Sequence, residues 1–169
     1  MNASQFAIRT LQPDEYRVLK ALRLKALGSD PLSFWETVDE ARAYNDAYWT
    51  TLTSKLTQPG GSRMFILEHG KSIGGFVFGV RKDGDEYRVG GLWVDPVHRS
   101  KGYGSLLVQQ VVAWAVSDSN TAVIQLWCAF DSTMSFYQKN CFHSLGRFRT
   151  NDSDGRQIVE MEWRDADPR

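Results

Sequence analysis

The sequence of 169 residues contains two cysteines, Cys128 and Cys141, and neither belongs to a Cys/His cluster with the spacing of a zinc site. Such a pair is typical of reduced, mostly buried thiols rather than of a disulfide framework. We therefore expect no metal centre, and we expect the protein to function in the cytoplasm.

The sequence also has no long hydrophobic run and no excess of either charge. Its longest purely apolar stretch, Val111 to Val116, is far too short to span a bilayer, and no apolar run near the N-terminus precedes a cleavage site. The 20 basic and 20 acidic side chains balance, which argues against binding to nucleic acid or to an anionic membrane. The 42% apolar content is that of a globular protein, and we expect residues 1–169 to form a single domain.

The most informative segment runs from Gly90 to Leu107 and is predicted to form a strand, a basic turn and a helix. The strand is expected to end before Pro96, which has no N–H to donate. The turn offers backbone N–H groups at the positive end of the helix dipole. Gly102 and Gly104 remove the β-carbons that would keep a ligand away, and two basic side chains add positive charge. These features predict a diphosphate site.

Three nucleotide-binding patterns compete for this turn. A P-loop requires its lysine after the second glycine, whereas Lys101 precedes Gly102, and a dinucleotide fingerprint requires glycine where the chain has Leu107. The pattern that fits is Arg-x-x-Gly-x-Gly after a strand ending in Val-Asp-Pro. It resembles the acetyl-coenzyme A site of the GCN5-related N-acetyltransferase (GNAT) superfamily. The resemblance implies acetyl-CoA as cosubstrate and these binding residues: Leu92, Trp93, Val94, Arg99, Ser100, Lys101, Gly102, Tyr103, Gly104 and Ser105.

The predicted elements follow the order β-α-α-β-β-β-α-β-α-β-β, as in that superfamily. The resemblance implies the acyl-CoA N-acyltransferase fold of the α/β (α+β) class, a mixed sheet of about seven strands with helices on both faces. The strands that contain Val94 and Val123 are expected to be parallel and to splay apart. Gly90 and Gly91 suggest a bulge or a close backbone approach. The first helix is expected to stop at Gly28, and the second to run from about Val38 to Leu56.

Tyr137 is the candidate general acid. The segment Phe130 to Phe142 resembles the superfamily segment Asn-x-x-Ala-x-x-Leu-Tyr-x-Lys-x-Gly-Phe, with Phe130 in place of the asparagine, Thr133 of the alanine and Cys141 of the glycine. An unperturbed phenol can protonate a departing thiolate. The alternative is that Tyr137 only packs its ring.

The general base is less well defined. Many relatives carry a glutamate where this chain has Arg88, and Glu86 shares its face of the strand by the period of two. Glu86 would act through water, and Asp95 or a backbone carbonyl are alternatives, as is an exposed strand-end role for Glu86. A Cys-His-Asp reading of Cys128, Asp131 and His143 is disfavoured, because the flanking residues are typical of a core.

Acceptor selection in the superfamily lies mainly with the first two helices, their loop and the last hairpin. Here that loop and the helix after it carry Trp35, Glu36 and Glu40. Aromatic walls with a few acids would suit a cationic amine. A helix with a core stripe and a solvated acidic face explains the same residues equally well.

We therefore expect an N-acetyltransferase that moves an acetyl group from acetyl-CoA to a primary amine, on a small molecule or a peptide, by direct attack in a ternary complex. A non-catalytic acyl-CoA-binding sensor is an alternative, because Arg88 and Phe130 depart from the family pattern. A nucleotide-binding regulatory domain is a third reading, disfavoured by the spacings above. We expect a monomer or a homodimer.

Overall fold

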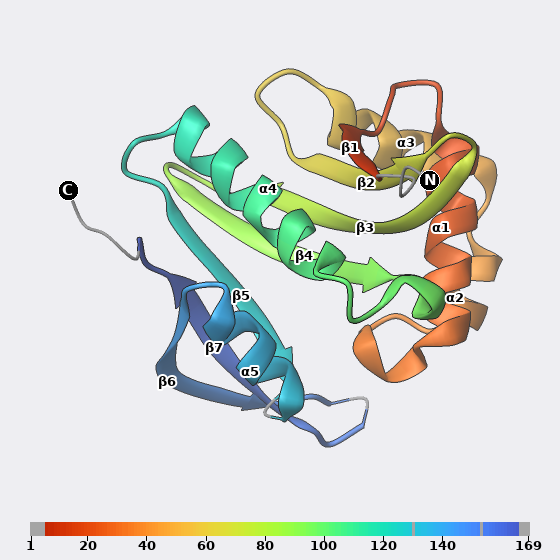
Figure 1. Cartoon of the computed structure of the whole chain (residues 1–169). Helices are drawn as coiled ribbons and strands as arrows, with labels where there is room; N and C mark the ends of the chain where they lie inside the picture. The colour runs from red at the N-terminus through yellow and green to blue at the C-terminus, as the bar shows by residue number, and fades with distance from the viewer. Residues whose placement is uncertain (1–5, 130, 153, 166–169) are drawn as a thin grey trace, which may run out of the picture.

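The computed structural model describes residues 6–129, 131–152 and 154–165 of the chain (Figure 1). Within these residues, seven strands form one mixed sheet in the order β1-β2-β3-β4-β5-β7-β6. The strands are β1 Ala7–Thr10, β2 Arg63–His69, β3 Ser72–Arg81, β4 Glu86–Val94, β5 Val123–Ala129, β6 Phe142–Thr150 and β7 Gln157–Trp163. The helices are α1 Tyr16–Ser29, α2 Val38–Ala43, α3 Asp46–Thr57, α4 Tyr103–Asp118 and α5 Ser132–Lys139, with short 3-10 turns η1 Pro31–Ser33 and η2 Pro96–His98. The expected mixed sheet of about seven strands is confirmed.

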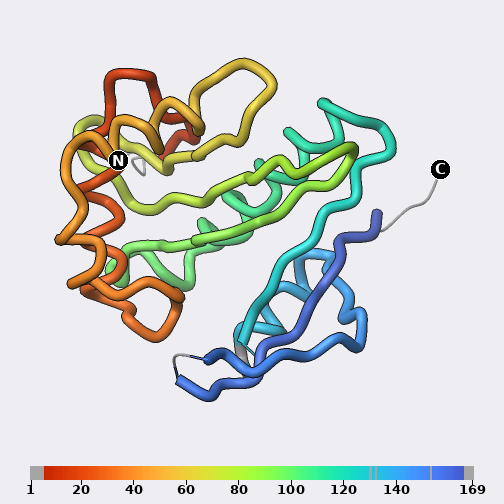
Figure 2. The backbone as a smooth tube through the Cα atoms, turned by 180° about the vertical axis from the view of Figure 1, so that it is seen from behind, coloured from red at the N-terminus to blue at the C-terminus, as the bar shows by residue number. Residues whose placement is uncertain are grey.

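The parallel neighbours β4 and β5 pair only at their beginnings. The ladder joins Glu86 to Val123, Tyr87 to Ile124 and Arg88 to Gln125, and it stops there. Both strands continue beyond this point, and Figure 2 shows their later parts diverging. The backbone groups of the two separated ends therefore face a wedge-shaped opening instead of each other. The splayed parallel pair expected from the resemblance is confirmed.

Helices cover both faces of the sheet because its central strands are apolar on both sides. On β2, Phe65 and Leu67 pack in a cluster with α4, whereas Met64 and Ile66 pack in a second cluster with α1 and α3. In Figure 1, α4 and α5 lie on one side of the sheet, and α1 to α3 lie on the other. The helices on both faces hold β4 in place. This strand leads into the predicted diphosphate-binding turn at residues 99–105, called the diphosphate turn below.

The expected irregularity at Gly90 and Gly91 is present as a bulge in β4. Phe78 of β3 pairs with Gly90 and Phe76 pairs with Trp93, so β4 holds one extra residue between these pairs. Gly91 has a positive φ of 58°, and a β-carbon there would lie 2.5 Å from the Phe78 ring. Glycine is therefore required at this position for backbone conformation and for space.

The prediction of one helix from Val38 to Leu56 is wrong, because two N-caps divide this segment. Thr37 and Glu40 form a reciprocal capping box at the start of α2. The Asn45 side chain then accepts a hydrogen bond of 3.0 Å from the Tyr48 N–H and begins α3. The break turns the chain between two short helices that both pack against α1.

The expected end of the first helix also differs from the structure. Helix α1 continues past Gly28 and ends at Ser29, and a β-carbon at Gly28 would meet nothing within 4 Å. No helix among the described residues is long and apolar enough to cross a membrane.

Candidate active site

The turn after β4 presents backbone donors at the start of α4. Gly102 is the N-cap of α4, and the Leu106 N–H donates to the Gly102 carbonyl at 3.1 Å. The N–H groups of the preceding turn therefore have no acceptor within the helix. They lie at the positive end of the α4 dipole, which is the arrangement that binds a diphosphate. The turn thus fits the diphosphate of coenzyme A.

The two glycines of the turn have different physical roles. Gly102 has a φ of 82°, in the left-handed region, although a β-carbon there would meet nothing within 4 Å. Gly104 has an ordinary φ, but a β-carbon would lie 3.3 Å from the Phe136 ring of α5. Gly102 therefore serves the backbone conformation, whereas Gly104 lets α5 approach the first turn of α4.

The Arg99 and Lys101 side chains contact the protein. Arg99 Nη2 lies 2.5 Å from Asp30 Oδ2, and Arg99 Nε donates to the Val94 carbonyl at 2.9 Å. Lys101 Nζ donates to the Val97 carbonyl at 3.3 Å. Burial opposes ionisation of Asp30, but hydrogen bonds from Arg99, Ser29 and Trp93 hold the pKa of this carboxyl below its usual value. Asp30 therefore joins the end of α1, strand β4 and the diphosphate turn.

Helix α5 closes one side of the wedge by contacts with α4. The Asn140 side chain, which is buried, donates to Ser105 Oγ at 3.1 Å and to the Phe136 carbonyl at 2.9 Å. Together with the close approach of Phe136 to Gly104, this bond fixes α5 against the diphosphate turn. Helix α5 therefore contacts the start of α4 and also lines the cavity, through Phe136 and Tyr137.

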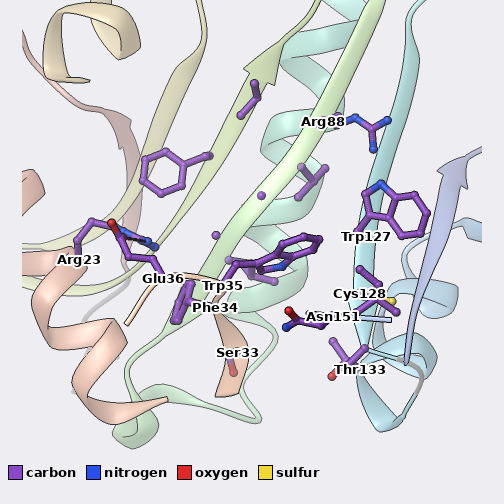
Figure 3. A pocket seen from close by; sticks show the side chains of 18 of the residues that line it. Arg23, Ser33, Phe34, Trp35, Glu36, Arg88, Trp127, Cys128, Thr133 and Asn151 are labelled. Atoms are coloured by element: carbon purple, nitrogen blue, oxygen red, sulfur yellow. Dashed lines mark hydrogen bonds and ion pairs between the residues drawn. The ribbon is translucent and has the colours of Figure 1, made fainter. Parts of the chain in front are cut away.

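A cavity of about 1000 Å³ is lined by both separated strands and by the loop between α1 and α2. One wall carries Arg23 and Glu36, and the opposite wall carries Arg88 and Trp127 (Figure 3). Trp35 lies between these walls, and 60% of its surface is exposed. The cavity reaches Tyr137 of α5 and Leu92 of β4. It therefore connects the opening between β4 and β5 with the loop between α1 and α2.

Tyr137 lines this cavity and is 9% exposed. Burial, and to a smaller extent the nearby Cys128, raise the pKa of the phenol well above its usual value. The expectation of an unperturbed phenol is therefore wrong. Tyr137 therefore keeps its proton at neutral pH.

Cys128 is a protonated thiol rather than a nucleophile. Its Sγ lies 3.5 Å from Met161 Sδ, and burial raises the pKa of the thiol to about 11. His143, on β6, is exposed, and in the sheet it lies opposite Glu162 of β7 rather than opposite a residue of β5. The structure therefore gives no support to a Cys-His-Asp arrangement.

The structure does not bring Glu86 to the cavity. Glu86 is exposed at the start of β4, where β4 is paired with β5, and it is absent from the described residues that line the cavity. Asp95 accepts hydrogen bonds from the Lys25 ammonium and the Val97 N–H. Phe130, which replaces the family asparagine, lies outside the described residues.

The acceptor residues predicted from the sequence divide into two groups. Trp35 and Glu36 line the cavity, and Glu36 Oε2 forms an ion pair of 2.6 Å with Arg23 Nη2. Glu40 caps α2 through Thr37 and does not belong to the described cavity lining. Hydrogen bonds from the Thr37 N–H and hydroxyl lower the pKa of Glu40. The structure therefore assigns Glu40 to the helix and leaves Glu36 at the cavity.

A family model described as the acetyltransferase (GNAT) family matches residues 24–141. The match includes β4, the diphosphate turn, α4 and α5. The chain belongs to the GNAT acetyltransferase family.

Solved structures of GNAT proteins share the fold of this chain. An acetyltransferase of the GNAT family from Streptococcus pneumoniae has a TM-score of 0.78 at 16% identity, covering 94% of this chain and 98% of that chain. Spermidine N-acetyltransferase from Vibrio cholerae in complex with CoA and spermine has a TM-score of 0.67 at 17% identity, covering 95% of each chain. The spermidine/spermine N-acetyltransferase of the same organism in complex with manganese ions has a TM-score of 0.68 at 17% identity, covering 94% of this chain and 92% of that chain. No curated protein sequence matches the chain.

Within the described residues of this GNAT protein, no group of three or more His, Cys, Asp or Glu side chains is placed to hold a metal ion. The residues that sequence reasoning missed are Asp30, which joins three elements, and Glu160, which is 4% exposed and bonds to Arg88. A sequence signal existed for Glu160, because it is the one acid between apolar neighbours in Ile158-Val159-Glu160-Met161. Asp30 left no such signal, since its partners Trp93 and Arg99 are distant in sequence.

Proposed function

We propose that this GNAT protein is an N-acetyltransferase that transfers the acetyl group of acetyl-CoA to a primary amine in a ternary complex. The observation that carries the proposal is the separation of β4 and β5 after Arg88, which opens into a cavity of about 1000 Å³. Residues Lys101 to Ser105 would hold the diphosphate with their N–H groups, and Leu92 to Val94 would lie along the pantetheine arm.

The transfer requires one bond to form and one to break. The amine nitrogen attacks the thioester carbonyl carbon, the carbon–sulfur bond breaks, the amine loses a proton and the departing thiolate gains one. Tyr137, which lines the cavity, is proposed as the donor to the thiolate, although its raised pKa makes it a weaker acid than an exposed phenol. Cys128, whose thiol has a pKa of about 11, takes no acetyl group, so the acceptor attacks directly.

We propose Glu36 as the residue that receives the amine proton, directly or through water. Among the described carboxylates that line the cavity, Asp131 accepts the Thr133 N–H as the N-cap of α5, whereas Glu36 pairs with a side chain, Arg23. In this role Glu36→Gln lowers kcat. Glu86→Gln is the matched control, because the Glu86 side chain lies outside the described lining of the cavity.

The activity is tested by incubating the protein with acetyl-CoA and a panel of primary amines. Release of the coenzyme A thiol and a mass increase of one acetyl group on the amine are expected together. Intersecting initial-velocity lines, retained by Cys128→Ala, would support direct attack, whereas parallel lines would indicate an acetylated enzyme. Tight binding of coenzyme A without turnover of any amine would favour a sensor instead.

A further inference from the structure

The described side chains that line the cavity give it an excess of positive charge. Both acids among them are already engaged, Glu36 with Arg23 at 2.6 Å and Asp131 with the Thr133 N–H at 2.8 Å. Lys82 also belongs to the lining, and no ion pair of its ammonium is found in the described part of the chain. Among the described lining residues, four basic side chains, those of Arg23, Lys82, Arg88 and Arg156, therefore stand against two carboxylates.

Arg88 is the centre of this excess. It lies opposite Gln125 at the last paired position of β4 and β5, where the strands separate. Arg88 Nη2 lies 3.0 Å from Glu160 Oε1, and Arg147 Nε lies 3.1 Å from Glu160 Oε2. The Glu160 side chain is only 5% exposed, so two guanidinium groups share one buried carboxylate. Arg88, Arg147 and Glu160 together carry one net positive charge, and the Glu162 carboxylate is connected to Arg88 only through Gln125.

The hydrogen bonding of Arg88 is also incomplete. Its Nη1 is shielded from solvent and has no hydrogen-bond partner among the described residues, although 30% of the side chain remains exposed. A buried donor of a charged group without an acceptor costs free energy. An anion in the cavity would balance the cluster and give the guanidinium an acceptor as the side chain turns toward it. A carboxylate suits the planar donor fork of arginine.

The position of Glu36 completes the argument. Figure 3 shows Glu36 and Arg88 on opposite sides of Trp35, so Arg88 is separated from the ion pair of Glu36 with Arg23. We propose that the acceptor is an amino compound that carries a carboxylate, an amino acid or a short peptide, and that Arg88 binds this carboxylate. The inference rests on the N-acetyltransferase function proposed above. It differs from the expectation of a purely cationic amine, which Arg88 and Lys82 would repel.

The test uses pairs of amines that differ only in the carboxyl group. Phenylalanine is compared with phenethylamine, lysine with cadaverine and β-alanine with ethylamine, and spermidine is included as a cationic acceptor. We expect at least one carboxylate-bearing member to have a kcat/KM roughly tenfold or more above its partner, the scale of a charge-assisted hydrogen bond. A protein that acetylates spermidine or the decarboxylated amines best overturns the inference but leaves the proposed activity standing.

The variant Arg88→Gln assigns the effect to Arg88. It should abolish the preference by raising the KM of the carboxylate-bearing acceptor, with kcat and the affinity for coenzyme A retained, because binding of the carboxylate is uniform along the reaction. Arg147→Gln is the control: it removes the other guanidinium from Glu160 on a side chain that is 64% exposed, and it should keep the preference. If Arg88→Gln does not fold, Arg88→Lys keeps the charge and should lose only part of the preference. An unchanged preference in the Arg88 variant overturns the inference.

Binding separates this inference from the proposed activity. Calorimetry with the coenzyme A complex measures phenylalanine against phenethylamine without any turnover. Preferential binding of phenylalanine that is lost in Arg88→Gln supports the carboxylate site even if no amine is acetylated, in which case the proposed activity fails alone. Equal binding of the two probes refutes the site.

Discussion

Tyr137 and Cys128 both line the cavity, and burial keeps both protonated at neutral pH. The consequences differ because the thiol must ionise to be useful as a nucleophile, whereas the phenol is useful with its proton in place. The two residues therefore share a protonation state and differ in what each chemical role requires of the protonated group.

Tyr137→Phe tests the proton donor. The substitution removes only the hydroxyl, so the ring contacts with Phe136 and Phe142 remain. We expect the affinity for coenzyme A to be retained and kcat to fall by roughly 10²-fold or more, the usual contribution of a general acid. Steady-state kinetics and calorimetry measure the two quantities. Equal kcat values in the two proteins would leave Tyr137 as a packing residue.

Asp30→Asn tests the carboxylate that joins α1, β4 and the diphosphate turn. The pKa of Asp30 is lowered in the folded protein, so its contribution to stability is complete above the ordinary value of about 4 and is lost as pH falls through the lowered folded value. The difference in unfolding free energy between the wild type and Asp30→Asn should therefore be largest at neutral pH and shrink in acid.

Urea denaturation at several pH values measures this difference. Asp39→Asn is the control for the change in net charge, since the Asp39 side chain is 87% exposed. A loss of stability in Asp30→Asn that is independent of pH, or no larger than that of the control, would contradict the role of the ion pair with Arg99.

At the scale of elements, the start of α4 depends on small residues and on backbone donors. Gly104→Glu places a carboxylate where the diphosphate is expected and brings a side chain against Phe136, 3.3 Å from the β-carbon position. Coenzyme A binding should be abolished by the repulsion and the lost space. Leu106→Glu adds the same charge in the same turn, but Leu106 is 47% exposed and points away from the core.

Calorimetry of both variants with coenzyme A distinguishes the two positions. Circular dichroism and the melting temperature show whether each variant is folded. Unchanged affinity in a folded Gly104→Glu protein, or an equal loss in Leu106→Glu, would move the diphosphate away from this turn.

Much of the fold could be predicted because local patterns and the family motif agree along most of the chain. The bulge at Gly91 and the separated strands after Arg88 follow from glycine placement and from the resemblance. The division of the second helix could not be predicted from periodicity, because it depends on the two side-chain caps at Thr37 and Asn45.

The backbone features of the candidate site could be predicted from the sequence, whereas the ion pairs between its side chains could not. Local sequence indicated the diphosphate turn, since its donors and glycines are adjacent. Acidic residues near Trp35 suggested a cationic acceptor, but Arg23 comes from another element and neutralises Glu36. The pairing of Arg88 with Glu160 joins residues 72 positions apart, which no local pattern encodes. The assignment of residues 1–169 to a single domain stays a prediction.

At the scale of the whole molecule, coenzyme A should stabilise the fold by bridging the turn and the wedge. At about a hundredfold excess over Kd, ligand binding adds about 2.7 kcal/mol, which raises the melting temperature by several degrees. Pantetheine, which lacks the diphosphate, is the matched control and should give a much smaller shift. Equal shifts for the two compounds would contradict a diphosphate-centred site.

The short ladder between β4 and β5 has a further consequence for how the protein opens. Three paired positions connect the half of the sheet that contains β1 to β4 with the half that contains β5 to β7. Helix α4 packs on the first half and α5 on the second, and the Asn140–Ser105 bond is one of the contacts between them. Amide hydrogen exchange should therefore reveal two cooperative units of different stability rather than one. The separated part of β4, although central in the sheet, should exchange faster than β2 until coenzyme A is bound.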